Sequence, residues 1–150
     1  MLRMTTELDI LAARIVGHRT MVLLNHKEPF VEYQIEISTP KGLVICWKRY
    51  SEFRILRAGL QRTSKLRRSQ LPALPPRRWL ANLSTDTIRE RTAQLNQFLT
   101  ELVAEENLQW GIQIDSTLAV LKRRRPCTID GSLLDSFRST TLASPQWYSV

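Results

Sequence analysis

A cation beside an aromatic ring, Arg49-Tyr50, is the pair in this sequence best suited to bind an anion. The pair lies where an alternating strand pattern gives way to a helical pattern, and a strand end holds side chains still enough for recognition. Arginine presents a planar, permanently charged fork that matches phosphate. Tyrosine presents a flat apolar face with a polar tip. The pair therefore predicts an anion-binding corner, and many anions are compatible with it.

The composition favours one domain with an anionic partner. The chain has 150 residues, and its hydrophobic fraction of 43% is enough to build a core. Its formal net charge is +8, which suits nucleic acid, an acidic membrane surface or phosphorylated ligands. Composition alone leaves open a merely soluble basic protein.

Several function classes find no support in the sequence. Two cysteines, Cys46 and Cys127, make no disulfide framework, and with only His18 and His26 nothing has zinc-ligand spacing. We find no catalytic residues of the common nucleophilic, paired-carboxylate or phosphate-loop kinds, so we expect no enzyme and no cofactor. A groove-reading helix and an aromatic single-strand platform are also missing, so we expect no nucleic-acid partner.

The sequence also indicates in which compartment the chain is expected and how it could contact a membrane. No apolar run approaches the length needed to span a bilayer, and the first residues lack the apolar core of a signal peptide. We expect a cytoplasmic chain whose membrane contact is peripheral.

Three strands are predicted before the corner. Residues 30–38 alternate apolar and polar side chains with the period of a half-buried strand. The sequence Thr-Pro-Lys-Gly at 39–42 then favours a tight turn, and 43–49 return as the partner strand. Leu43, Ile45, Trp47 and Arg49 share one face of that strand. Residues 9–16 and 20–24 predict one or two further strands with Gly17 as a break, so we expect a three-stranded antiparallel meander.

Three helices are predicted after the corner. Ser51 is the expected cap of a helix over 52–63, and Ser84 starts a second helix. The apolar stripe of the second helix comprises Ile88, Leu95, Phe98, Leu99 and Leu102. Residues 115–123 fit a short third helix. Between the first two helices, three prolines in Leu71-Pro72-Ala73-Leu74-Pro75-Pro76-Arg77 forbid a helix and predict an extended polyproline segment.

Arg91 lies inside the apolar stripe of the second helix, and a charge there needs a partner or a ligand. The alternative is that its stem packs while its head reaches water. The basic residues Lys65, Arg67 and Arg68 leave a similar choice between a second anion site and a solvated loop.

These motifs, in this order, make the chain resemble the phox homology (PX) domain, a phosphoinositide-binding family that is widespread in sorting nexins. The resemblance runs from about residue 10 to residue 123. Its most specific parts are Lys48-Arg49-Tyr50-Ser51-Glu52-Phe53, the proline segment 71–77, and the helix sequence 88–99. It implies an α+β fold in which a three-stranded antiparallel sheet packs on about three helices. We expect an N-terminal arm over 1–8, a PX-like domain over 9–124, and a flexible Ser/Thr-rich tail over 125–150 that offers possible protein contacts.

The resemblance also implies roles for individual residues. Arg49 matches the arginine that grips the 3-phosphate, Tyr50 the aromatic that packs on the inositol ring, and Ser51 a further phosphate contact. Arg77 takes the place of the cation that pairs with the 1-phosphate, and Arg91 that of the arginine that binds the 4- and 5-hydroxyls. Trp79 and Leu80 lie in the loop that dips into the bilayer in the family, although they could instead pack against the protein.

We expect a lipid-binding module that brings the protein to endosomal membranes in trafficking or sorting. The lipid expected from the resemblance is phosphatidylinositol 3-phosphate, which this family binds most often. The alternative is a protein-interaction domain on the same fold whose lipid binding is weak or lost. The prolines could also serve a partner that recognises proline motifs. The segment between the first helix and the prolines is short, which puts in doubt the second head-group site that is sometimes built there.

Overall fold

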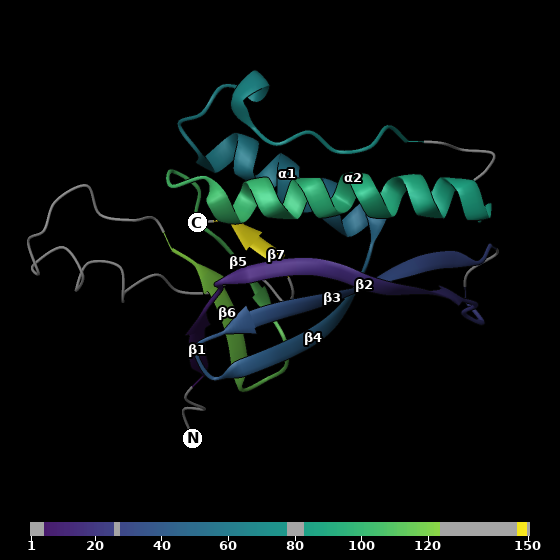
Figure 1. Cartoon of the computed structure of the whole chain (residues 1–150), viewed down its shortest axis with the longest axis horizontal. Helices are drawn as coiled ribbons and strands as arrows, with labels where there is room; N and C mark the ends of the chain where they lie inside the picture. Colours follow the sequence, from purple (N-terminus) through teal and green to yellow (C-terminus); the bar gives the residue numbers. More distant parts are fainter. Residues whose placement is uncertain (1–4, 26–27, 78–82, 124–146, 150) are drawn as a thin grey trace, which may run out of the picture.

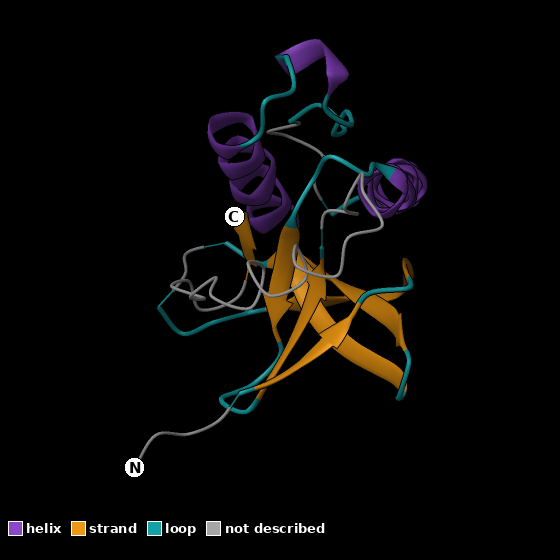
Figure 2. Cartoon of the chain, turned by 90° about the vertical axis from the view of Figure 1, so that its left-hand side faces the viewer, coloured by secondary structure: helices purple, strands orange, loops and turns teal. Residues whose placement is uncertain are grey.

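The computed structural model describes residues 5–25, 28–77, 83–123 and 147–149 of the chain. In this part of the chain both α-helices lie on the same side of the strands (Figure 1, Figure 2). Helix α1 spans Tyr50–Thr63 and helix α2 spans Thr85–Ala104, with a short 3-10 turn, η1, at Arg68–Gln70. The core lies between these helices and the strands.

The expected antiparallel meander is present. Strands β2 (Ala12–Met21), β3 (Phe30–Thr39) and β4 (Gly42–Arg49) form one sheet in the order β2-β3-β4. Gly42 has φ 123°, which glycine adopts without steric cost, so β3 can turn directly into β4. Gly17 does not break the first strand as expected; the register shifts between Ile15 and Gly17, so β2 bends at a bulge and continues.

Hydrophobic periodicity correctly predicts the core. The apolar side chains of β3 face the helices and are buried: Val31, Tyr33, Ile35 and Ile37. Those of α1 do the same: Phe53, Leu56 and Leu60. All five predicted stripe residues of α2 are buried as well. The Phe53 and Phe98 rings meet edge to face, with centroids 6.3 Å apart, so the two helices interlock above the sheet.

The predicted N-cap is correct for α2 and wrong for α1. Ser84 is the N-cap of α2, and its Oγ accepts a hydrogen bond from Thr87 N–H at 3.1 Å, as expected. The cap of α1 is Arg49 rather than Ser51. The Glu52 carboxylate accepts the Arg49 N–H at 2.7 Å, so the helix begins directly at Tyr50 and the exposed Ser51 lies in its first turn.

The predicted third helix over 115–123 is wrong, because these residues belong to a strand hairpin. Strands β5 (Trp110–Gln113) and β6 (Leu118–Lys122) pair antiparallel around a turn at Asp115. The Asp115 Oδ1 atom accepts hydrogen bonds from Thr117 N–H at 2.7 Å, from its hydroxyl at 2.7 Å and from Leu118 N–H at 2.9 Å. Such side-chain bonds compete with helix formation and fix a turn instead.

The hairpin belongs to a second, four-stranded sheet with the order β1-β6-β5-β7. Strand β1 (Thr6–Asp9) pairs parallel with β6, and β7 (Trp147–Ser149) pairs antiparallel with β5. Part of the expected arm and part of the expected tail are thus strands of this sheet. The remainder of the predicted tail, residues 125–146 and 150, lies outside the described residues, as do Trp79 and Leu80.

The Asp115 turn generates a pH-dependent prediction. Hydrogen bonds, led by that of the Thr117 backbone, lower the pKa of Asp115 below its ordinary value of 3.8. The folded chain therefore keeps Asp115 ionised at a pH where the unfolded chain protonates it, and the stability that this carboxylate adds is lost as the pH falls below about 3.8 towards the folded pKa. We expect Asp115→Asn to lower the free energy of unfolding near neutral pH, measured with urea, and the difference from wild type to shrink in acid. A difference that stays constant with pH would contradict this role.

Candidate anion-binding site

Tyr50 joins three segments that are far apart in the sequence. It follows β4 directly as the first residue of α1. Its hydroxyl donates a hydrogen bond to the carbonyl oxygen of Pro75 in the proline segment. The Arg91 guanidinium of α2 lies over its ring, with Cζ 4.3 Å from the ring centroid. The end of β4, the proline segment and α2 therefore meet at this side chain.

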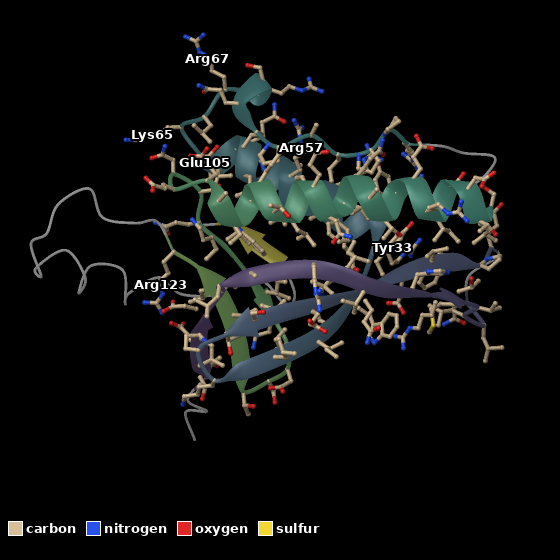
Figure 3. The ribbon with its side chains drawn as sticks, viewed as in Figure 1. Tyr33, Arg57, Lys65, Arg67, Glu105 and Arg123 are labelled. Atoms are coloured by element: carbon tan, nitrogen blue, oxygen red, sulfur yellow. The ribbon has the colours of Figure 1, made fainter. Side chains whose placement is uncertain are left out.

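Arg91 is buried, with only 6% of its surface exposed. Its head does not reach water from the apolar stripe, because it stacks on Tyr50 instead. The fully buried Tyr33 of β3 is close enough for the Arg91 charge to affect it: burial raises the pKa of Tyr33, and the positive charge of Arg91 opposes that rise. In Figure 3, Tyr33 lies between the sheet and α2. A guanidinium held in this way is positioned to bond an anionic or hydroxylated ligand at the same place.

Arg49 lies on the other face of the sheet from the core. It is directly opposite Glu32 in the ladder of β3 and β4, and Glu32 belongs to the outward series of β3. The Arg49 Cζ atom lies 3.9 Å from the ring centroid of Phe30, the first residue of β3. The half-buried Arg49 side chain therefore sits at the end of the sheet, one residue before Tyr50.

The proline segment is fixed to α1 by an arginine. Arg57 Nε donates to the carbonyl oxygen of Pro72 at 2.8 Å, and its Nη2 donates to that of Arg68 at 3.3 Å. Together with the Tyr50–Pro75 bond, this anchors the segment at two points. Arg77 follows Pro75 by two residues, and its side chain is exposed.

The structure thus brings Tyr50 and Arg91 into contact and puts Arg49 and Arg77 on the segments that flank that contact. The exposed Ser51 is in the first turn of α1, beside both Arg49 and Tyr50 in the chain. Trp79 and Leu80 are outside the described residues.

Sequence reasoning missed several residues around this site. The alternating pattern over 30–38 predicts Phe30 only as the start of a strand, yet its ring supports Arg49. Lys48 faces inward and is 3% exposed, and burial lowers its pKa while the nearby Glu52 raises it. The strand alternation that exposes Arg49 could have indicated this, since neighbouring residues of a strand point to opposite faces.

A second missed feature is an apolar loop beside the site. Val22, Leu23 and Leu24 are 76%, 42% and 106% exposed in the connection that leads from β2 to Phe30. Leu83, just before α2, is 44% exposed. The β2–β3 connection and the start of α2 lie at the same end of the molecule, on the right of Figure 1. Exposed apolar groups gathered at one end commonly mark a contact with membrane or protein.

The basic residues after α1 divide between two environments. Arg68 lines a pocket of about 400 Å³ together with Tyr50, Arg54 and Arg57. Lys65 and Arg67 extend away from the body of the molecule in Figure 3. Arg68 therefore contributes to a basic pocket on the side of α1.

Metal and membrane-spanning features are not seen in the part of the chain that the structure describes. Among those residues no group of three or more His, Cys, Asp or Glu side chains could hold a metal ion. None of the helices there is both long and apolar enough to cross a membrane.

The comparisons with known proteins agree with the resemblance in the sequence. Residues 43–110 match the family model of the PX domain. A designed CISK-PX domain is similar in structure, with a TM-score of 0.55 and 23% sequence identity over 63% of this chain and 86% of that one. The mouse SNX19 PX domain, crystallised with a sulphate ion, has a TM-score of 0.50 and 24% identity over 65% of this chain and 86% of that one. None of the curated proteins matches the chain.

These matches confirm the PX resemblance and the α+β fold, with two α-helices in place of about three in the described residues. At these identities the solved structures establish the fold alone. The matched residues run from the start of β4 through α2 to the first residue of β5, so they contain Arg49, Tyr50, Arg77 and Arg91.

The hydroxyl of Tyr50 can be tested separately from its ring. Tyr50→Phe removes the bond to the Pro75 carbonyl and keeps the surface on which Arg91 stacks. We expect the free energy of unfolding in urea to fall by about 0.5–1.5 kcal/mol, the usual contribution of one hydrogen bond. Tyr50→Ala should cost more, because the buried Arg91 then loses its ring as well. Equal stabilities for wild type and Tyr50→Phe would show that the hydroxyl does not hold the proline segment.

Proposed function

Because residues 43–110 match the family model of the PX domain, we propose that this chain is a phosphoinositide-binding module for phosphatidylinositol 3-phosphate. A PX domain implies a phosphoinositide-binding or membrane-trafficking module that contacts membranes peripherally, and the family is in general non-catalytic. The finer part of the proposal is the choice of the 3-phosphate, with recruitment to endosomal membranes for trafficking or sorting as its consequence.

The single observation that carries the proposal is the stacking of Arg91 on Tyr50 next to Arg49. The buried Arg91 guanidinium, the Tyr50 ring on which it stacks and Arg49, one residue before Tyr50 in the chain, are of the types that suit the parts of a phosphorylated inositol: hydroxyls, a ring with an apolar face, and a charged phosphate. In the proposed complex Arg49 pairs with the 3-phosphate, Tyr50 packs on the ring, and Arg91 bonds the 4- and 5-hydroxyls. Ser51 adds a phosphate contact.

Arg77, at the end of the proline segment, supplies a further positive charge in the proposed site. Arg77 is exposed two residues beyond the Pro75 anchor, where it can pair with the 1-phosphate that joins the head group to the lipid. Each cation near an anionic surface adds about 1 kcal/mol to binding. The net charge of +8 supports attraction to such a surface as well.

Apolar insertion completes the proposed membrane contact. Trp79 and Leu80 are the proposed insertion residues, and the exposed Leu23 and Leu24 of the β2–β3 connection offer a further apolar edge. Full burial of one large apolar side chain is worth about 1.5–3 kcal/mol. Head-group pairing and insertion together give binding that is useful and still reversible.

Substitutions of the site arginines test head-group recognition. Arg49→Gln or Arg91→Gln should weaken binding to phosphatidylcholine vesicles containing phosphatidylinositol 3-phosphate by about tenfold or more, since hydrogen bonds to charged groups contribute about 1.5–3 kcal/mol. Arg14→Gln is a matched control, because Arg14 lies on the outer face of the sheet, paired with Glu36. Binding is measured by co-sedimentation and compared with vesicles that lack the 3-phosphate. Equal binding of every variant to both vesicles would contradict lipid recognition and favour the protein-interaction alternative.

Substitutions in the apolar loop test insertion independently. We expect the double substitution Leu23→Ser/Leu24→Ser to weaken vesicle binding by about tenfold while leaving the affinity for a soluble short-chain head group unchanged. Leu43→Ser serves as the control, because Leu43 is 64% exposed on β4, outside this loop. If the control weakens vesicle binding as much as the double substitution, general surface hydrophobicity explains the effect.

A further inference from the structure

Arg49 shares the outer face of the sheet with a carboxylate that could capture it. Glu32 of β3 lies directly opposite Arg49 of β4. Side chains in directly opposite positions have Cβ atoms about 4.5–5.5 Å apart, which is within reach of an arginine and a carboxylate. An Arg49–Glu32 pair would be a bidentate ion pair of the same kind that a phosphate needs from Arg49. The ligand would then have to displace it.

The third strand supplies a different partner for Glu32. Arg19 of β2 lies opposite Glu32 on its other side. Arg19 Nη2 is 2.9 Å and its Nε 3.0 Å from Glu32 Oε1, and the Glu32 side chain is only 17% exposed. Arg19 is itself fixed, because its Cζ lies 4.0 Å from the centroid of the Trp47 ring. Glu32 is therefore neutralised and turned towards β2.

Arg49 has a matching aromatic support. Its Cζ stacks 3.9 Å from the centroid of Phe30, so the two arginines are held by two different rings on either side of Glu32. In the structure the Glu32 carboxylate accepts hydrogen bonds from Arg19, and the Arg49 guanidinium lies against Phe30. The arrangement keeps the positive charge of Arg49 available at the end of the sheet.

We propose that Arg19 is a positioning residue for the head-group site, which holds Glu32 away from Arg49 and so leaves Arg49 open to phosphate. This inference rests on the proposed function. Arg19 touches no ligand in this role and acts through Glu32. Trp47 serves the same role by fixing Arg19.

A second ion pair on the same face of the sheet serves as a control for the proposed role of Arg19. Arg14 and Glu36 form an equivalent pair on the same face, with Arg14 Nη2 2.9 Å from Glu36 Oε1. The residue opposite Glu36 on β4 is Ile45, which cannot be captured by a carboxylate. Substituting Arg14 removes the same charge from the same face, but the carboxylate that loses its partner, Glu36, lies opposite Ile45 and not opposite an arginine.

The test uses the full chain and vesicles with or without phosphatidylinositol 3-phosphate. Arg19→Met should weaken binding to the 3-phosphate vesicles by about fivefold to tenfold, and Arg19→Met/Glu32→Gln should return it to within about twofold of wild type. Arg14→Met should have little effect. Arg19→Met/Glu36→Gln has the same net charge as the rescued variant and should remain weak. Thermal unfolding midpoints of all variants identify any that lose the fold.

Two results would overturn the inference. If Arg19→Met/Glu32→Gln binds as weakly as Arg19→Met, then Arg19 acts directly on the membrane. If Arg14→Met is as harmful as Arg19→Met, only the total charge of the face matters.

A lipid-free measurement separates this inference from the proposed function. The side-chain Nε–H signal of Arg49 in NMR spectra should shift in Arg19→Met, as Glu32 turns to Arg49, and return in Arg19→Met/Glu32→Gln. An unchanged Arg49 signal in Arg19→Met would refute the positioning role even if the vesicles bind. Failure of wild type to distinguish the two vesicles would refute the proposed function and leave the Arg49 signal to decide the positioning role.

Discussion

The stacking of Arg91 on Tyr50, with the Tyr50 hydroxyl bonded to the Pro75 carbonyl, is the contact on which the site depends. Burying a guanidinium is costly unless polar or aromatic groups surround it, and Tyr50 and Tyr33 are two such groups around Arg91 in the apolar stripe of α2. The same side chain ties the proline segment to the end of β4. Helix, strand and proline segment are therefore held together at the Tyr50 side chain.

Because side chains alternate between the two faces of β4, its last two residues, both cations, lie in different environments. Lys48 faces the core, where burial lowers its pKa, whereas Arg49 faces outward against Phe30. Tyr50 is then the first residue of α1, and its ring contacts Arg91 of α2. One stretch of three residues thus contributes an inner cation, an outer cation and an aromatic contact point, and the outer cation is the one that neighbouring strands keep open through the Arg19–Glu32 pair.

Local patterns predicted what depends on local sequence. Alternation with a period of two residues correctly predicted strands β3 and β4 and the buried residues of β3. The apolar stripe predicted for α2 is also buried. Both predictions are correct because burial of one face determines the spacing of apolar residues in a strand and in a helix. The helix expected over 115–123 was wrong because Asp115 fixes a turn and β6 finds β1 and β5 as partners, one of them more than a hundred residues away. The cap at Ser51 failed because Glu52 bonds the Arg49 N–H. The residues of the site could be named from their order, but the contacts with Phe30, Glu32 and Arg19 depend on strand register, which the sequence of β4 does not contain.

The most direct test of the central claim is an NMR titration of the isotope-labelled chain with soluble short-chain phosphatidylinositol 3-phosphate. We expect the amide signals of Arg49, Tyr50 and Arg77 to shift together, and the side-chain Nε–H signal of Arg91 to move as its guanidinium exchanges the Tyr50 ring for the inositol hydroxyls. Shifts confined to the groove between His18 of β2 and α2 at Arg89, with the Arg91 signal unchanged, would contradict the account.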